Sequence, residues 1–239
     1  NSSGIFGKDA GNNGTVTAIN CYVIGDITAR ASTGIFGPYS GSSSGTVRAI
    51  NCYFEGNINA SNSCGIFGEY SGSSIDSTAV AENCYFKGHL NASNSSGIFG
   101  QYSCSTSGNV TAKNCYFDGD IFTDNSIGIF GSYCGSTDDG SAVAENCYMI
   151  GNLNSNWANG IFGQYAGSTN GSAEAKNCYF VGTLKNGGRG KGITINNNDN
   201  LTIKNCYTVD TLIGEKWDDV SANQALTSQS IYVVTNSNK

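Results

Sequence analysis

The sequence of 239 residues has little charge and only one proline, one methionine and one histidine. Only 13% of the residues are charged and the formal net charge is −6, which argues against a nucleic-acid partner. The chain has no apolar run of about 18 residues, so we expect no insertion into a membrane. It also lacks the Ala, Glu, Lys and Leu content that is typical of coiled coils and helical bundles.

Glycine and aromatic residues are abundant, and two short motifs recur along the chain. Glycine occurs 33 times, and aromatic residues make up 11% of the chain. The tetrapeptide GIFG begins at Gly4, Gly34, Gly65, Gly97, Gly128 and Gly160. The tripeptide NCY contains Cys21, Cys52, Cys84, Cys115, Cys147, Cys178 and Cys206. Both markers share a period of about 31 residues, which indicates a repeat architecture.

Each repeat alternates apolar and polar positions around its NCY tripeptide, which predicts two short β-strands. In the second repeat, Val47 and Ala49 alternate with Arg48 before the asparagine. Phe54 and Ile58 continue the alternation after the tripeptide, with the phase shifted by one residue. Such a shift is typical of a corner between two strands. The expected unit is therefore a strand, an asparagine corner, a strand, a loop, a short GIFG strand and a second loop.

Stacked copies of this unit predict an all-β fold, a right-handed parallel β-helix or β-solenoid. Residues 1–213 would form about seven coils, one for each repeat, with equivalent strands about 4.8 Å apart. Residues 214–239 would form a C-terminal cap. In this cap we expect a short helix beginning at Asp218 or Asp219, Trp217 closing the core, and a strand over 230–234.

The first repeat has no visible cap in front of it. An uncapped coil exposes strand edges, which favour pairing with another chain. We therefore expect the first coil to stack on a preceding domain, on adjoining repeats of a longer protein or on a second copy of the chain.

The second repeat carries a resemblance to a known family. Its residues 34–58 read GIFGPYSGSSSGTVRAINCYFEGNI, and this unit resembles the GLUG-motif repeat through GIFG and through Asn51, Cys52, Tyr53, Gly56 and Asn57. The resemblance covers residues 4–212. This chain departs from the motif in two ways, because it has Phe in the tetrapeptide and usually one glycine before it rather than two. Similar repeats occur in large surface and secreted proteins, among them adhesins and proteases, and in giant-virus proteins. The resemblance implies a β-solenoid stalk at an exterior surface and no catalytic residues.

Stacking converts each repeated position into a column of side chains. One such column is expected to form an asparagine ladder, in which side-chain amides bond to the next coil. Its members are Asn20, Asn51, Asn83, Asn114, Asn146 and Asn177. Charges alternate in two outward columns, and lateral ion pairs are expected there. The first contains Glu82, Lys113, Glu145 and Lys176, and the second contains Glu55, Lys87 and Asp118.

The seven NCY cysteines are expected to point inward as free, buried thiols. Stacking at about 4.8 Å keeps their Cβ atoms farther apart than the roughly 3.5–4.5 Å that a disulfide needs. No ligands converge on this column from a second strand, so we expect no metal site. Cys104 and Cys134 differ, because they occupy loops of adjacent repeats, and the sequence leaves open a disulfide between them.

Tyrosines following the cysteines should point outward and form an aromatic stripe that could bind a sugar ring or another protein. They are Tyr22, Tyr53, Tyr85, Tyr116, Tyr148 and Tyr179. A second column follows GIFG and contains Tyr39, Tyr70, Tyr102, Tyr133 and Tyr165. The alternative is that both columns are covered by mutual stacking and by the flanking loops.

No catalytic constellation stands out in the sequence. The only histidine, His89, occupies an outward position that other repeats fill with Asp or Asn, so it reads as a solvated variant of that position. A glycosidase needs two carboxylates about 5–9.5 Å apart. Asp138 and Asp139, like Asp218 and Asp219, are adjacent residues without the features of such a pair. We therefore expect no enzymatic activity and no cofactor.

The sequence favours a structural and adhesive module at an exterior surface, namely an extracellular protein, a cell surface, a fibre or a virion. Assembly end to end is compatible with this role, and the partner would be surface glycans or another protein. The alternative is a β-helix protein that binds or cleaves polysaccharide, such as a polysaccharide lyase or glycoside hydrolase. Ice binding would need a flat array of threonines, whereas the outward columns are charged or aromatic.

Overall fold

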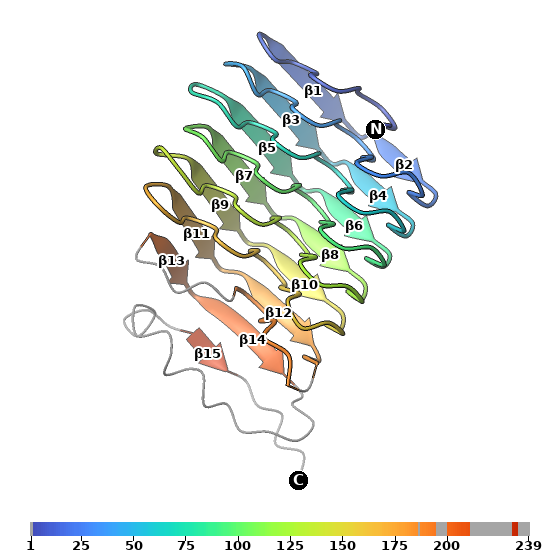
Figure 1. The fold of residues 1–239 in the computed structure, drawn as a ribbon, viewed down its shortest axis with the longest axis vertical. Coiled ribbons are helices and arrows are strands. Elements are labelled where there is room, and N and C mark those ends of the chain that lie inside the picture. Colours follow the sequence, from blue (N-terminus) through green and yellow to red (C-terminus); the bar gives the residue numbers. More distant parts are fainter. Residues whose placement is uncertain (1, 186, 195–199, 211–230, 234–239) are drawn as a thin grey trace.

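The chain winds as two parallel β-sheets that share one axis (Figure 1). The structure, a computed structural model, describes residues 2–185, 187–194, 200–210 and 231–233. The first sheet contains β1 (Thr15–Ile19), β3 (Thr46–Ile50), β5 (Thr78–Glu82), β7 (Asn109–Lys113), β9 (Ser141–Glu145), β11 (Ser172–Lys176) and β13 (Leu201–Lys204). The second contains β2 (Tyr22–Ile24), β4 (Tyr53–Glu55), β6 (Tyr85–Lys87), β8 (Tyr116–Asp118), β10 (Tyr148–Ile150), β12 (Tyr179–Gly182), β14 (Cys206–Asp210) and β15 (Ile231–Val233).

Equivalent residues of successive repeats stack on one another, which confirms the predicted parallel β-solenoid. Val47 of β3 lies between Val16 of β1 and Ala79 of β5. The same register holds in the second sheet, where Phe54 of β4 pairs with Phe86 of β6. No helix occurs within the described residues. The strict repeat of the motifs therefore sets the register, because a slip of one residue would turn every apolar side chain outward.

The asparagine of NCY forms the corner between the two sheets, as predicted. Asn51 joins β3 to β4 and has a φ of 52°, and the equivalent asparagines of the other repeats have φ values of 50–54°. Asparagine tolerates this left-handed conformation better than other residues with a Cβ, because its short amide can bond locally. The turn explains the phase shift, since Val47 before it and Phe54 after it both point into the core and are fully buried.

The third side of each coil differs from the expectation of a short GIFG strand. It consists of two isolated bridges, Thr33 with Cys64 and Phe36 with Phe67, separated by a bend. Because the chain bends at this point, adjacent Ile35 and Phe36 are both fully buried. Alternation along a regular strand would have sent one of them outward.

The first glycine of GIFG is required by close packing between coils. A Cβ added to Gly97 would clash with the carbonyl oxygen of Gly128 in the next coil. In the other repeats, the first glycine of GIFG faces the equivalent carbonyl of the next coil. Any side chain at this position would therefore separate the coils.

The core is a set of aromatic and aliphatic columns along the axis. The GIFG phenylalanines stack face to face, with ring centroids 4.8–4.9 Å apart and interplanar angles of 3–12°. Ala49, Cys52 and Ile58 represent three further columns, and all three are fully buried. A single coil could not bury these residues by itself, so stability depends on neighbouring coils.

The predicted cap is described in part. β15 over Ile231–Val233 pairs in parallel with β14, which confirms a strand within the expected range 230–234. The predicted helix start at Asp218 or Asp219 and the closing Trp217 lie outside the described residues.

Candidate functional site

The outer face of the second sheet carries a regular array of stacked aromatic side chains. Its members are Tyr22, Tyr53, Tyr85, Tyr116, Tyr148 and Tyr179, which we call the tyrosine ladder. Neighbouring rings are stacked, with centroids 4.7–5.0 Å apart and interplanar angles of 3–6°. All six point outward, as predicted. Tyr22 is 55% exposed at the first coil, and the rings from Tyr53 to Tyr148 are half-buried by their neighbours.

Stacking decides which parts of these rings can reach a partner. Tyr85 lies 4.7 Å from Tyr53 and 4.9 Å from Tyr116 between ring centroids, so both of its faces are covered. The ladder therefore presents ring edges and hydroxyl groups to solvent. Only Tyr22 has no stacked ring on its N-terminal side within the described residues. A sugar ring, which binds against an aromatic face, finds no open face along the interior of the ladder.

A charged column runs beside the ladder on the same face. The hydroxyl of Tyr85 donates to Oε1 of Glu55 at 2.9 Å. Desolvation, together with this bond to a carboxylate, raises the pKa of Tyr85 above its usual value. Lys87 and Asp118 follow Glu55 in register along the sheet. The central coils thus combine hydroxyl groups with charges of both signs.

The same column becomes apolar toward both ends of the sheet. Ile24 is 66% exposed at the first coil, and Ile150 and Val181 are 42% and 37% exposed on β10 and β12. The outer face therefore has a charged centre between two apolar regions.

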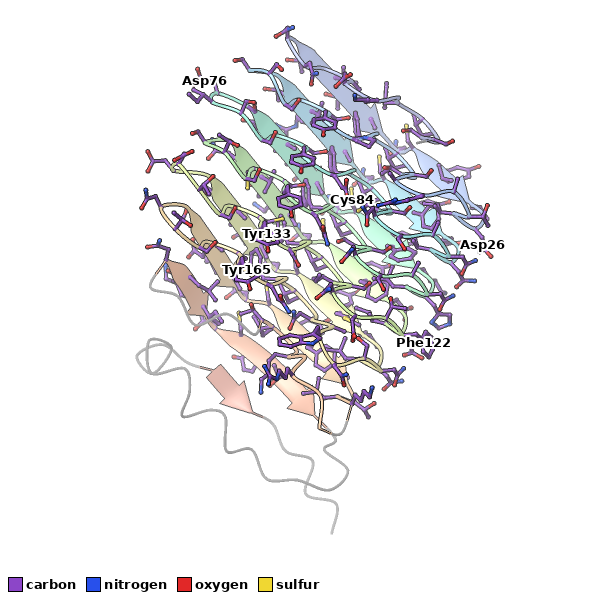
Figure 2. All side chains as sticks on the ribbon, in the orientation of Figure 1. Asp26, Asp76, Cys84, Phe122, Tyr133 and Tyr165 are labelled. Atoms are coloured by element: carbon purple, nitrogen blue, oxygen red, sulfur yellow. The ribbon has the colours of Figure 1, made fainter. Side chains whose placement is uncertain are left out.

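The second tyrosine column also stacks. Tyr39, Tyr70, Tyr102, Tyr133 and Tyr165 have ring centroids 4.8–5.0 Å apart. Figure 2 shows Tyr133 and Tyr165 on neighbouring coils of one face. All five have φ values of 59–64°, which is uncommon for a residue with a large side chain. Desolvation raises the pKa of Tyr70 and of Tyr133. Stacking along the column offsets part of the backbone strain.

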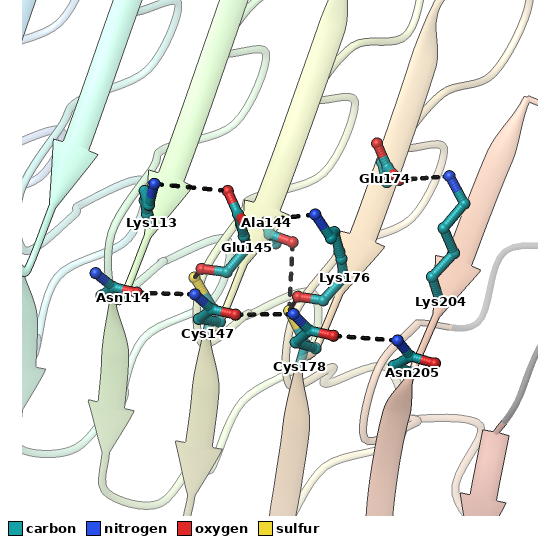
Figure 3. A network of polar contacts seen from close by, with 12 residues as sticks. Lys113, Asn114, Ala144, Glu145, Cys147, Glu174, Lys176, Cys178, Lys204 and Asn205 are labelled. Atoms are coloured by element: carbon teal, nitrogen blue, oxygen red, sulfur yellow. Dashed lines mark hydrogen bonds and ion pairs between the residues drawn. The ribbon is translucent and has the colours of Figure 1, made fainter.

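The predicted asparagine ladder is present at the corner between the sheets (Figure 3). Each Nδ2 donates to Oδ1 of the asparagine in the preceding coil, from Asn51 onto Asn20 at 3.2 Å to Asn205 onto Asn177 at 3.4 Å. The intervening bonds measure 3.0–3.1 Å. Each amide from Asn51 to Asn177 thus uses one donor and one acceptor along the axis, which gives this column a structural role.

The predicted ion pairs form in one of the two charged columns, with a change of partners. In the part of the chain that the structure describes, Glu55, Lys87 and Asp118 form no ion pair with one another, and Glu55 accepts from the Tyr85 hydroxyl instead. Glu145 lies between Lys113 at 3.9 Å and Lys176 at 3.5 Å, as the alternation of sign predicts. Glu82 pairs with Arg48 at 3.6 Å, whereas the sequence indicated Lys113. The long Arg48 side chain starts two positions away along the neighbouring strand, and diagonal neighbours on one face lie within reach of such side chains.

The cysteines are free, as the sequence predicted for the NCY column. The thiol of Cys115 donates to the carbonyl of Ala81 in the preceding coil at 3.4 Å, and the equivalent bond recurs along the column. Burial raises the pKa of the Cys115 thiol. Cysteine suits this column because it is small and apolar and carries a weak donor.

The disulfide that the sequence left open between Cys104 and Cys134 is not formed, and both thiols are free and fully buried. The two residues do not occupy equivalent positions. The amide of Gly135, which follows Cys134, donates to Ser103, which precedes Cys104. Cys134 therefore stacks on Ser103 rather than on Cys104, and its thiol lies 3.7 Å from the carbonyl oxygen of Gly100.

His89 belongs to a column whose hydrogen bonds between coils the sequence interpretation missed. Its Nδ1 accepts from the amide of Asp120 at 3.1 Å, and its own amide donates to Oδ1 of Asn57 at 3.0 Å. Asp26 and Asp120 accept in the same way from Asn57 and Asn152, both at 2.7 Å. His89 is thus exposed, as the sequence predicted, and it also serves as an acceptor in a ladder. The signal was available, because Asp, Asn and unprotonated His all offer an acceptor close to the backbone.

The described part of the chain contains no group of three or more His, Cys, Asp or Glu side chains that could hold a metal ion. Asp138 and Asp139 are exposed at a turn, with φ values of 49° and 66°. Asp218 and Asp219 lie outside the described residues. In those same described ranges, no helix is long and apolar enough to cross a membrane.

Comparison with family models, with curated proteins and with solved structures finds no match to this chain.

Proposed function

We propose that the chain is a rigid structural and adhesive module of an exterior surface, such as a cell surface, a fibre or a virion. The proposal rests on one observation, the continuous tyrosine ladder on the outer face of the second sheet. Tyrosine gives a large, rigid contact area at a low cost in side-chain entropy, and it is enriched in protein interfaces. The resemblance of the repeats to the GLUG motif supports the exterior location.

Rigidity follows from how each coil is fixed to the next one. Backbone bonds in both sheets, the asparagine ladder and the acceptor ladder of His89 all run along the same axis. Bending the solenoid would stretch bonds in several columns at once. A contact face on such a scaffold is preorganised, so binding loses little conformational entropy.

The tyrosine ladder also favours adhesion over polysaccharide cleavage. Cleavage needs a unique pair of carboxylates about 5–9.5 Å apart, whereas the ladder repeats one residue type along the axis. Tight binding of a sugar chain would need open ring faces, and the interior rings are covered by their neighbours. The accessible edges and hydroxyls fit a partner that offers hydrogen-bonding and apolar groups together.

The test compares retention of the protein on beads of cellulose, chitin, xylan and gelatin, with released oligosaccharide measured in the same samples. We expect retention on gelatin, the protein surface, rather than on the three polysaccharides, and no release of oligosaccharide. Replacing Tyr53, Tyr85 and Tyr116 by Ala should abolish that retention, because three consecutive rungs are removed.

The matched control replaces Tyr39, Tyr70 and Tyr102 by Ala. These residues lie in the same three coils and stack at a similar spacing, but on a different side of the coil. Retention should survive in this variant, and circular dichroism should show that both variants keep the sheet. Equal loss in both variants, release of oligosaccharide, or no retention of the parent protein would each contradict the proposal.

A further inference from the structure

The loop that follows the second sheet departs from the repeat in three successive coils. Its first position, directly after an isoleucine or leucine of the core, holds Thr28, Asn59, Asn91, Phe122, Asn154 and Lys185 along the axis. A later position, three residues before the next GIFG glycine or its equivalent Gly192, holds Ala31, Asn62, Asn94, Asn125, Trp157 and Arg189. Small or amide side chains fill both positions in the first three coils, whereas each of the next three coils carries an aromatic or cationic side chain. Such departures from a local rule are expected at functional sites.

Phe122 interrupts a ladder of amides and gains no burial in return. In the two preceding coils, Nδ2 of Asn91 donates to Oδ1 of Asn59 at 2.9 Å. Phe122 cannot continue this bond, and it is 48% exposed at the edge of the solenoid (Figure 2). Its one described ring contact is with His89, at 5.6 Å between centroids and an interplanar angle of 63°. Phe122 therefore offers open ring surface, which the interior rings of the tyrosine ladder do not.

Arg189 is held in place by an indole ring. Its guanidinium lies over Trp157 of the preceding coil, 4.9 Å from the ring centroid. Its amide donates to the carbonyl of Asn156 at 2.7 Å. Stacking on the indole limits the orientations of the planar guanidinium, and a planar fork binds a carboxylate or a similar oxyanion in a bidentate manner. Arg189 is therefore a preorganised anion-binding group that remains exposed.

The cations Arg189 and Lys185 have no carboxylate partner in the described parts of the chain. On the first sheet, by contrast, Lys204 pairs with Glu174 at 2.8 Å. Asp124, the acidic residue of the fourth coil's loop, accepts from a backbone amide at 2.8 Å. The two cations are therefore available to an anion from outside the chain.

The spacing of these groups fits a sugar chain that lies along the solenoid axis. Backbone bonds of 2.8 Å to the preceding coil place Asn154 and Lys185 in register after Phe122. Coils repeat at about 4.8 Å, so a ring, an amide and a cation follow one another over about 10 Å. The apolar face of a sugar packs against an aromatic ring, its hydroxyls bond to amides, and its acid groups pair with cations. An acidic peptide would use the cations but would need neither the open ring nor the amide.

We propose that the loops of the fourth to sixth coils form a binding site for an acidic polysaccharide, a sugar chain that carries carboxylate or sulfate groups. Phe122 packs against a sugar ring, Asn154 bonds to hydroxyls, and Lys185 and Arg189 pair with the acid groups. The site uses these loops rather than the outer face of the second sheet, so it is separate from the tyrosine ladder.

The test measures binding of the complete chain to immobilised polygalacturonate and heparin, which carry carboxylate and sulfate groups, by surface plasmon resonance at low salt. The repeat itself supplies replacements that suit the fold, because asparagine occupies both loop positions in other coils. Lys185→Asn combined with Arg189→Asn should weaken binding to the better of the two polymers by at least about tenfold, because charge-assisted bonds are lost. Phe122→Asn should weaken it by about two- to tenfold.

A matched control removes two exposed cations outside these coils. Arg30→Ser combined with Lys87→Gln changes the net charge by the same amount, and serine occupies the position of Arg30 in the next coil as Ser61. This variant should bind within about twofold of the parent, because salt screens charges that do not touch the ligand. Circular dichroism should show that all variants keep the sheet.

Two further polymers test the class of ligand. Polyglutamate should bind at least about tenfold more weakly than the better polysaccharide, and neutral dextran should not bind, because each lacks one of the two required features. The proposal is overturned if neither acidic polysaccharide binds the parent, if polyglutamate or dextran binds as tightly, or if the control loses as much affinity as the loop variant. Unchanged binding by Phe122→Asn would also overturn it, since the cations alone would then bind any polyanion.

The same variants separate this proposal from the proposed function. Replacing Tyr53, Tyr85 and Tyr116 by Ala should leave binding to the acidic polysaccharide unchanged. The loop variants should in turn keep their retention on gelatin. Loss of polysaccharide binding in the tyrosine variant would overturn the separate site, whatever the result on gelatin.

Discussion

The buried phenylalanine column and the exposed tyrosine ladder have almost the same geometry in different surroundings. Ring centroids are 4.8–4.9 Å apart in the GIFG phenylalanines and 4.7–5.0 Å apart in the tyrosine ladder. Phe99 is fully buried and Tyr116 of the same coil is half-buried. The spacing of the coils therefore sets the stacking distance in both columns. The surroundings decide whether a ring stabilises the core or remains available for contact.

The largest expected effect comes from opening a cavity in the buried column. Phe99 lies between Phe67 and Phe130, at 4.8 and 4.9 Å between ring centroids. Phe99→Ala should lower the free energy of unfolding by about 3–5 kcal/mol, measured by urea denaturation. Phe99→Leu keeps most of the volume and should cost clearly less. A loss below about 1 kcal/mol for the alanine variant would show that this column contributes little to the stability of the core.

The matched substitution in the tyrosine ladder should cost less. Tyr116 stacks on Tyr85 and Tyr148 at 4.9 and 4.8 Å, but its edge already contacts water. Tyr116→Ala should lower the free energy of unfolding by about 1–3 kcal/mol, since two aromatic pairs are lost and each contributes about 0.5–1.5 kcal/mol. Tyr116→Phe should be close to neutral. If Tyr116→Ala cost as much as Phe99→Ala, the distinction between the two columns would fail.

A third substitution examines the corner that separates the two sheets. Asn114 has a φ of 53° and takes part in two ladder bonds, of 3.0 and 3.1 Å. Asn114→Ala should cost about 1–2 kcal/mol more than Asn114→Gly, because alanine adopts the left-handed conformation with difficulty. Asn114→Gly removes the amide and both of its ladder bonds and should cost about 1–3 kcal/mol, at about 0.5–1.5 kcal/mol for each hydrogen bond. Thermal unfolding of the two variants separates the stability contributed by the backbone conformation of this residue from that of the ladder bonds. Equal losses of stability would assign the whole effect to the amide.

The smallest expected effect concerns the exposed charges. Glu145 pairs with Lys113 and Lys176, and its side chain is 30% exposed. Glu145→Gln should lower the free energy of unfolding by about 0.2–1 kcal/mol at low salt. The difference should vanish in high salt, because mobile ions screen such pairs. A loss that persists in high salt would indicate a packing role for this side chain.

Much of the fold could be predicted because the repeat supplies the same information several times. The spacing of GIFG and NCY predicted the parallel stack, and the phase shift at the asparagine predicted the corner at Asn51. The ladder from Asn20 to Asn177 followed directly, since identical amides at strand spacing can bond only to each other along the axis.

Other features could not be predicted because they depend on the path of the chain between the strands. The bend that buries both Ile35 and Phe36 replaced an expected strand. The offset of Cys104 from Cys134 depends on the register of two loops, which the motifs do not define. The residue types in the column of His89 indicate an acceptor, but one sequence does not show which backbone group it meets, here the amide of Asp120.

By itself, the sequence determined the repeat, the parallel stacking and the identity of each column, because equivalent positions must coincide when identical units are stacked. Only the tertiary structure decided what each column presents to its surroundings. It covered the faces of the interior tyrosine rings and fixed the direction of the ladders. These properties arise from the orientation of side chains and amides between coils, and a linear pattern of residue types does not define that orientation.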